Sequence, residues 1–101
     1  MEKLFISLPM KDKTNEQIRV KREKLHHDAQ RILGHEVELI DTFFEDVPHD
    51  ATPLYYLSKA IELMGDAKYV MFASDWKSAR GCRVEHLVAK EYGKEILREI
   101  M

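Results

Sequence analysis

The sequence is poor in several residue types, with one cysteine, three prolines and four glycines among 101 residues. A single cysteine excludes an internal disulfide and a zinc site built from cysteines, and it fits a reducing compartment. No apolar run approaches the ~18 residues of a membrane span, so we expect no membrane partner. The N-terminus lacks the pattern of a secretory signal, and we therefore expect a cytoplasmic protein.

An excess of positive charge is also absent, because 16 basic residues face 18 acidic ones and the net charge is -2. A protein that coats DNA or RNA has a strongly basic surface, so we expect no nucleic acid polymer as partner. A pocket for one nucleotide remains compatible with this charge. The phosphate-binding patterns Gly-x-x-x-x-Gly-Lys and Gly-x-Gly-x-x-Gly are missing, which disfavours an ATPase or a dinucleotide enzyme. The five histidines are scattered, and we expect no metal and no other cofactor.

Apolar residues recur with the spacings of strands and helices in alternation. The expected strands are Leu4–Leu8, Val37–Ile40, Tyr69–Ala73 and Glu95–Leu97. The apolar stripes of the three intervening helices are Ile18, Leu25, Ala29, Ile32 and Leu33; Leu54, Leu57, Ile61 and Met64; and Val84, Leu87, Val88 and Tyr92.

Short polar motifs mark the ends of these helices. Thr14 with Gln17 forms a capping box, and Thr52 precedes a proline at the first helical position. Three glycines are expected as left-handed helix C-caps: Gly34, Gly65 and Gly93.

This alternation predicts one α/β domain over residues 1–101, with a parallel sheet and right-handed crossovers. We expect a small three-layer doubly wound fold, flavodoxin- or Rossmann-like, with about four strands in the order 2-1-3-4. Ligands of such sheets bind at the carboxyl ends of the strands, between strands 1 and 3. The loops expected there are Ser7–Lys13 and Ser74–Gly81, with Asp41–Asp50 close by.

The segment Ser78–Glu85 follows the third strand and opens the third helix. A small, basic, glycine-containing turn at a helix start binds anions through its N–H groups and the helix dipole. Gly81 at this position allows a ligand to approach the backbone. Glu85, about one turn into the helix, has two interpretations: a nucleophile or base at the sheet edge, or a carboxylate that only stabilises the helix dipole.

Helical geometry places Glu85 on a stripe with Cys82 and Ala89. The neighbouring stripe of Val84, Leu87 and Val88 is expected to face the sheet. Cys82 is expected to be a buried thiol; the alternative is a thiol–imidazole pair with His86, four residues further on.

Other polar residues of these loops have alternative interpretations. Arg80 and Arg83 could pair with a phosphate or form solvated ion pairs, and Ser7 and Ser78 are hydroxyl donors suited to phosphate. Asp75 could bind sugar hydroxyls or only start a turn. Trp76, the only tryptophan, could stack on a base or ribose, or contact another subunit.

Two stretches of the sequence resemble the nucleoside 2-deoxyribosyltransferase superfamily. Phe5-Ile6-Ser7-Leu8-Pro9-Met10 is similar to its first strand and the Pro-containing loop. Residues 67–89 are similar to its strand, polar loop and Gly-x-x-x-Glu helix. The stretch from Trp76 to His86 matches the Trp-x-x-x-Arg-Gly-Cys-Arg-x-Glu-His pattern of a branch of small bacterial and phage-type proteins.

The resemblance implies chemistry at the N-glycosidic bond of a nucleoside or nucleotide. Glu85 would be the nucleophile that attacks the anomeric carbon. Ser7, Pro9 and Met10 would line the base or sugar pocket. Ser78, Arg80 and Gly81 would hold a 5′-phosphate, and a homodimer or higher oligomer is implied. Tyr55, Tyr56 and Trp76 are candidate subunit contacts.

Two further functions are kept beside this one. The superfamily usually has an acidic residue on its second helix, where this chain has Ser58 with Glu62 as a shifted substitute. That departure favours a nucleotide-binding or sensing module without turnover. A thiol-based activity at Cys82 is the third hypothesis.

Overall fold

The computed structural model describes residues 1–42 and 50–99 of the chain. Its strands are β1 (Lys3–Ser7), β2 (Glu38–Leu39), β3 (Tyr69–Phe72) and β4 (Glu95–Arg98). Its helices are α1 (Asn15–Leu33), α2 (Pro53–Met64) and α3 (Arg80–Glu91), with a short 3-10 helix η1 (Trp76–Ser78) before α3.

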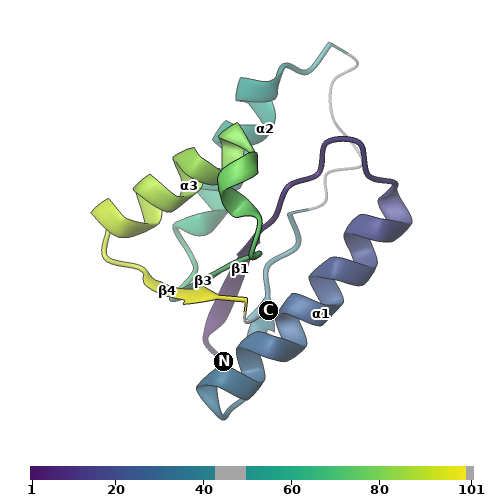
Figure 1. The fold of residues 1–101 in the computed structure, drawn as a ribbon. Coiled ribbons are helices and arrows are strands. Elements are labelled where there is room, and N and C mark those ends of the chain that lie inside the picture. The colour runs from purple at the N-terminus through teal and green to yellow at the C-terminus, as the bar shows by residue number, and fades with distance from the viewer. Residues whose placement is uncertain (43–49, 100–101) are drawn as a thin grey trace.

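The four strands form one parallel sheet in the order β2-β1-β3-β4, as predicted from the sequence (Figure 1). Leu4 pairs with Tyr69 and Ser7 with Phe72, so β1 and β3 end side by side. The backbone continues this pairing, because the Ala73 N–H donates to the Ser7 carbonyl at 3.0 Å. The loop after β1 and the turn after β3 therefore start at the same edge of the sheet.

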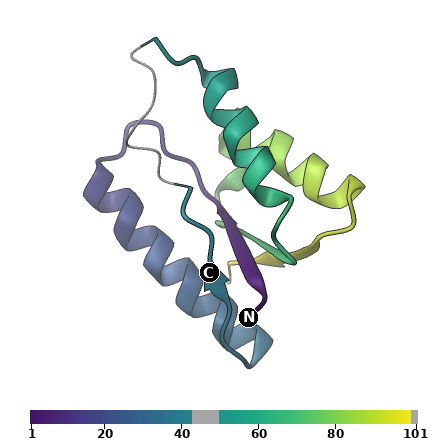
Figure 2. The same ribbon diagram turned by 180° about the vertical axis from the view of Figure 1, so that it is seen from behind.

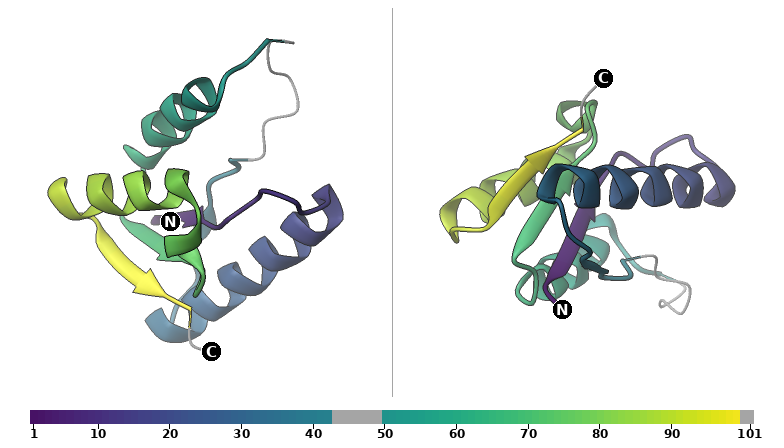
Figure 3. Two further views of the ribbon diagram at one scale, coloured as in Figure 1. Left: turned by 45° about the horizontal axis from the view of Figure 1, so that its top comes forward. Right: turned by 90° about the horizontal axis from the view of Figure 1, so that it is seen from below.

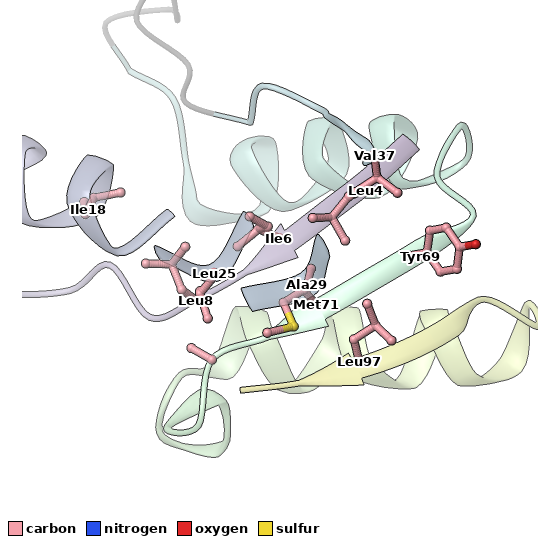
Figure 4. Packing of buried hydrophobic residues seen from close by; sticks show 11 residues of the cluster. Leu4, Ile6, Leu8, Ile18, Leu25, Ala29, Val37, Tyr69, Met71 and Leu97 are labelled. Carbon is pink, nitrogen blue, oxygen red and sulfur yellow. The ribbon is translucent and has the colours of Figure 1, made fainter. Parts of the chain in front are cut away.

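Helices cover both faces of the sheet, which gives the three layers of a small Rossmann-like fold (Figures 2 and 3). Side chains alternate between the two faces along each strand. One face of the sheet packs against α1 in a cluster shown in Figure 4, which comprises Leu4, Ile6, Leu8, Ile18, Leu25, Ala29, Val37, Tyr69, Met71, Ala73 and Leu97. The other face packs against α2 and α3 through Phe5, Ala60, Met64, Ala67, Val70, Phe72 and Ala89.

Most of the expected helix caps are present. The Thr14 hydroxyl accepts from the Gln17 N–H and the Gln17 side chain accepts from the Thr14 N–H. The Thr52 hydroxyl caps α2 at the Tyr55 N–H. Gly34 has a φ of 77° and so uses the left-handed region, but Gly65 has a φ of -55° and the prediction of a left-handed cap there is wrong. Backbone bonds of the tight turn after α2, from Gly65 and Asp66 back to Glu62 and Leu63, close that helix instead.

The predicted apolar stripe of α3 is only partly correct, because Val88 packs against the core whereas Leu87 and Tyr92 do not. Leu87 is 57% exposed and Tyr92 is 78% exposed, whereas Cys82 and Ala89 are buried against the sheet. Small side chains fit between α3 and the strands, and the larger Leu87 and Tyr92 are left outside. Glu85, which shares the stripe of Cys82 and Ala89, therefore lies on the sheet-facing side of α3.

The other two helices also leave apolar residues of their stripes in solvent. Ile32 of α1 is 44% exposed and Leu54 of α2 is 74% exposed. Leu54 lies in the first turn of α2, and Ile32 lies near the end of α1 beside Leu33, which does pack against the core.

Candidate functional site

A hydrogen bond between Ser7 and Glu85 lies at the carboxyl edge of the sheet. The Ser7 hydroxyl donates to Oε1 of Glu85 at 2.6 Å. Ser7 is the last residue of β1 and is 2% exposed, and its side chain points to the face covered by α2 and α3. Glu85 comes to it from the second turn of α3. The sheet and the helix thus bring together two of the residues selected from the sequence.

The surroundings of Glu85 favour its protonated form. Burial raises the pKa of this carboxyl to about 7, and the hydrogen bond from Ser7 opposes that shift by stabilising the charged form. A carboxyl group with a pKa near the working pH can be charged or neutral in the same site. This is a usual property of carboxylates that act in catalysis, although structural groups also show it.

Cys82 lies one turn before Glu85 and is 4% exposed. Burial raises the pKa of its thiol to about 11, and the negative charges of Glu85 and Asp75 add to this effect. The thiol is therefore protonated at neutral pH and a poor nucleophile. The expectation of a buried, small thiol is confirmed.

The loop after β1 is tied to the turn after β3 by Lys13. Its ammonium group donates to the Pro9 carbonyl at 3.2 Å and lies 3.6 Å from Oδ2 of Asp75. Pro9 is buried, whereas Met10 is 52% exposed. The positive charge of Lys13 also lowers the pKa of Cys82, which places it near the first turn of α3.

The first turn of α3 has no side-chain cap. Ala79 occupies the N-cap position, and a Cβ added to Gly81 would meet no atom within 4 Å. Arg80 and Gly81 are both exposed and are the first two residues of α3. The Ser78 hydroxyl donates to the Asp75 carbonyl at 2.8 Å, so it closes η1 on itself. Uncapped N–H groups at an accessible helix start are suited to an anion.

Trp76 belongs to a second group of residues on another side of α3. Its ring stacks on His86 with a centroid distance of 4.1 Å and an angle of 7°, and it packs on Phe72 at 5.6 Å. Burial, followed by the charges of Arg98, Lys90 and Lys77, lowers the pKa of His86. The half-buried Trp76 is thus held by contacts of its own, and its role at the Ser7–Glu85 site stays a prediction.

An open hollow of about 410 Å³ lies beside this stack. The residues that line it are Trp76, Lys77, Arg83, His86, Leu87 and Lys90. Neither Ser7 nor Glu85 is among them.

Helix α2 offers no carboxylate to Glu85 at Ser58 or Glu62. The Ser58 hydroxyl donates to the Tyr55 carbonyl of its own helix at 2.8 Å. The Glu62 side chain is 75% exposed and lies 3.9 Å from the Lys59 ammonium group. Neither residue is a substitute for the acidic residue that the resemblance implies.

A charged cluster around Glu99 was missed by the sequence reasoning. Glu99 follows β4 directly, its side chain is 4% exposed, and it accepts from Lys21 at 2.6 Å and Lys24 at 2.7 Å. The Ser74 N–H donates to its other oxygen at 2.9 Å. Burial raises the pKa of Glu99, but these bonds outweigh it and lower the pKa to about 2. The sequence signal for this cluster was a pair of lysines three residues apart on a helix and an acidic residue after the last strand. Whether these residues meet depends on the order of the strands in the sheet.

Residues 1–42 and 50–99 contain no group of three or more histidine, cysteine, aspartate or glutamate side chains that could hold a metal ion. Within the same residues, no helix has the length and apolar character needed to cross a membrane. Of the expected loop Asp41–Asp50, residues 43–49 lie outside the described residues.

Comparison with known proteins connects the whole arrangement to one family. A comparison with curated proteins found no match. The family model described as "Domain of unknown function (DUF4406)" matches residues 2–98, which include every strand and helix of the fold and both Ser7 and Glu85. The chain therefore belongs to the DUF4406 family.

Proposed function

We propose that the chain is an enzyme that acts on the N-glycosidic bond of a nucleoside or nucleotide, as a transferase or hydrolase. The observation that carries the proposal is the hydrogen bond of 2.6 Å between Ser7 and the half-buried Glu85 at the carboxyl edge of the sheet. This is where doubly wound folds bind their ligands. The sequence resemblance to the nucleoside 2-deoxyribosyltransferase superfamily supports the same residue as nucleophile.

In the proposed reaction, the Glu85 carboxylate attacks the anomeric carbon of the sugar. A bond forms between Oε2 and that carbon as the C–N bond breaks, and its electron pair leaves with the base, which takes up a proton from solvent water. Water or a second base then attacks the same carbon, returns a proton to the solvent and releases Glu85 as the carboxylate. The positive charge that develops on the sugar favours the charged form of Glu85.

The remaining residues have supporting roles in this proposal. Ser7 positions one carboxylate oxygen and leaves the other for the sugar. Pro9, Met10 and Asp75 line the entrance from the two loops that Lys13 connects. The first turn of α3, with Arg80, Gly81 and Ser78, accepts a phosphate where the substrate carries one. Trp76 has no assigned role in this reaction, because its ring stacks on His86 and lines a hollow that includes neither Ser7 nor Glu85.

A nucleotide-binding module without turnover is the second candidate. The Ser58 hydroxyl is engaged within its own helix and Glu62 points into solvent, so no acidic side chain of α2 at these positions assists Glu85. The raised pKa of Cys82 removes the support for a thiol-based activity.

We also propose a cytoplasmic protein that binds small molecules and forms homodimers or higher oligomers. Tyr56 is 38% exposed and Leu54 is 74% exposed on α2, which supports a subunit contact there. This subunit contact is tested by measuring the molar mass in solution of the native chain and of Leu54→Glu.

The experiment that tests the enzymatic proposal uses a panel of deoxynucleosides and their monophosphates, with and without an acceptor base. Base release and exchange are followed by chromatography for the native chain, Glu85→Gln and Glu91→Gln. Glu91 is the matched control because it is exposed on the same helix. Turnover that is lost in Glu85→Gln alone supports the enzyme. Binding of a nucleotide without turnover supports the second candidate.

A further inference from the structure

The hollow beside Trp76 has an apolar centre and a rim of a single charge sign. Trp76 and Leu87 supply the apolar surface, and Leu87 is 57% exposed. Lys77, Arg83 and Lys90 surround them, and the described residues that line the hollow include no acidic side chain. The chain as a whole has a net charge of -2, so a rim of only positive charge is a local feature.

The spacing of residues on α3 creates this surface. Arg83, Leu87 and Lys90 recur at intervals of four and three residues, which places them on one stripe of the helix. Cys82, Glu85 and Ala89 occupy the stripe that faces the sheet. Helix α3 therefore presents Glu85 and the hollow on different sides, and the hollow is separate from the proposed glycosidic site.

The central aromatic ring is held in place before any ligand arrives. Trp76 lies flat on His86 at 4.1 Å and contacts Phe72, while Lys77 has its ammonium group 5.6 Å from the Trp76 ring centre. The Arg83 guanidinium group donates to the Lys77 carbonyl at 2.7 Å, which connects α3 to η1. A rigid aromatic anchor with arginine at its side is typical of the residues that dominate protein interfaces.

We propose that this hollow, lined by Trp76, Lys77, Arg83, Leu87 and Lys90, is a docking site for an acidic peptide segment of a partner protein. The segment places an apolar side chain on Trp76 and Leu87, and its carboxylates meet the three cations. The volume of about 410 Å³ fits one or two side chains. A nucleic acid strand instead needs a basic groove that continues along several nucleotides, and the net charge of -2 disfavours it.

The experiment uses Trp76, the only tryptophan of the chain, as a fluorescent reporter. The probe is a short peptide with a leucine flanked by glutamates on both sides. Control peptides replace the glutamates by lysines or the leucine by alanine. The protein variants are Arg83→Glu and Lys90→Glu, and Arg19→Glu on α1 is the control with the same change of charge on the other face of the sheet. Lys90→Glu keeps the hydrogen bond between Arg83 and Lys77, so it tests the charge without disturbing that contact.

We expect saturable binding of the acidic peptide that weakens as salt is added. Both hollow variants should lose at least about tenfold in affinity, whereas Arg19→Glu should not. The control peptides should bind weakly or not at all. Equal losses in all three variants, no binding of the acidic peptide, or tighter binding of single-stranded DNA would overturn the proposal. Self-association of the native chain that Lys90→Glu abolishes would also overturn it, because a second copy would then occupy the hollow.

Discussion

The Ser7 hydroxyl and the Glu85 carboxylate are 78 residues apart in sequence and joined by a hydrogen bond of 2.6 Å. The bond connects the last residue of the strand β1 to the second turn of α3. Burial and this bond act on Glu85 in opposite directions, since burial favours the neutral carboxyl and Ser7 favours the carboxylate.

Replacing Ser7 by alanine should therefore raise the pKa of Glu85 further, because only the effect of burial remains. An activity that needs the carboxylate should increase as the pH rises through about 7 in the native chain. This rising part of the pH–rate profile should move to higher pH in Ser7→Ala. The rate at pH 7 should fall by about tenfold or more, the usual effect of losing one hydrogen bond to a charged group. The pH profile of the rate of base release measures both effects. If the rising part of the profile stayed at the same pH in Ser7→Ala, that would contradict the role of Ser7.

The raised pKa of Glu85 predicts how stability depends on pH. Its pKa is 4.5 in the unfolded chain and about 7 in the folded one, so folding favours the protonated form. The stability that this provides is complete below pH 4.5 and is lost as the pH rises through 7. Glu85→Gln cannot ionise and should gain stability over the native chain by up to about 3 kcal/mol at pH 8, with little difference at pH 4. Urea unfolding at these two pH values measures this, and a gain independent of pH would contradict it.

The lowered pKa of Glu99 predicts the opposite dependence of stability on pH. Its folded pKa of about 2 lies below the ordinary 4.5, so its stabilising effect is complete above pH 4.5 and is lost as the pH falls through 2. Glu99→Gln should lower the free energy of unfolding at pH 7 by about 2 kcal/mol, because Lys21, Lys24 and the Ser74 N–H lose a charged partner. The difference from the native chain should shrink near pH 2. Glu95→Gln, at an exposed position of the preceding strand β4, is the control.

Cys82 should resist alkylation while the chain is folded. Cys82 is 4% exposed and its thiol has a pKa of about 11. A reagent therefore has little access to the sulfur, and very little of the thiol is in the reactive thiolate form. Labelling with iodoacetamide at pH 8 should be slow in buffer and fast in denaturant, as followed by intact mass. Rapid labelling of the native chain would restore the thiol hypothesis.

The strand order and the layers followed from the sequence because the apolar runs of β1 and β3 are short, continuous and separated by helical spacing. The edge of the sheet where Ser7 lies could be predicted for the same reason. The face of α3 that packs on the sheet could not be predicted in this way. Periodicity selected the larger residues Val84 and Leu87, whereas close packing on the sheet requires the small Cys82 and Ala89.

The partners of polar side chains were the other part that the sequence did not reveal. Trp76 and His86 lie ten residues apart and stack because η1 folds back onto α3. The contacts of Glu99 with Lys21 and Lys24 depend on β4 ending beside α1. Such pairs form when elements that are distant in the sequence pack together. The periodicity of a single segment holds no information about that packing.

The most direct test of the proposed function is to trap the covalent intermediate on Glu85. The native chain and Glu85→Gln are mixed with the deoxynucleosides and monophosphates of the panel, quenched in acid, and analysed by intact mass and peptide mapping. We expect an added sugar or sugar phosphate on the peptide that contains Glu85, and none in Glu85→Gln. Release of free base without any adduct at Glu85, or with an adduct on another residue, would show that Glu85 is not the nucleophile.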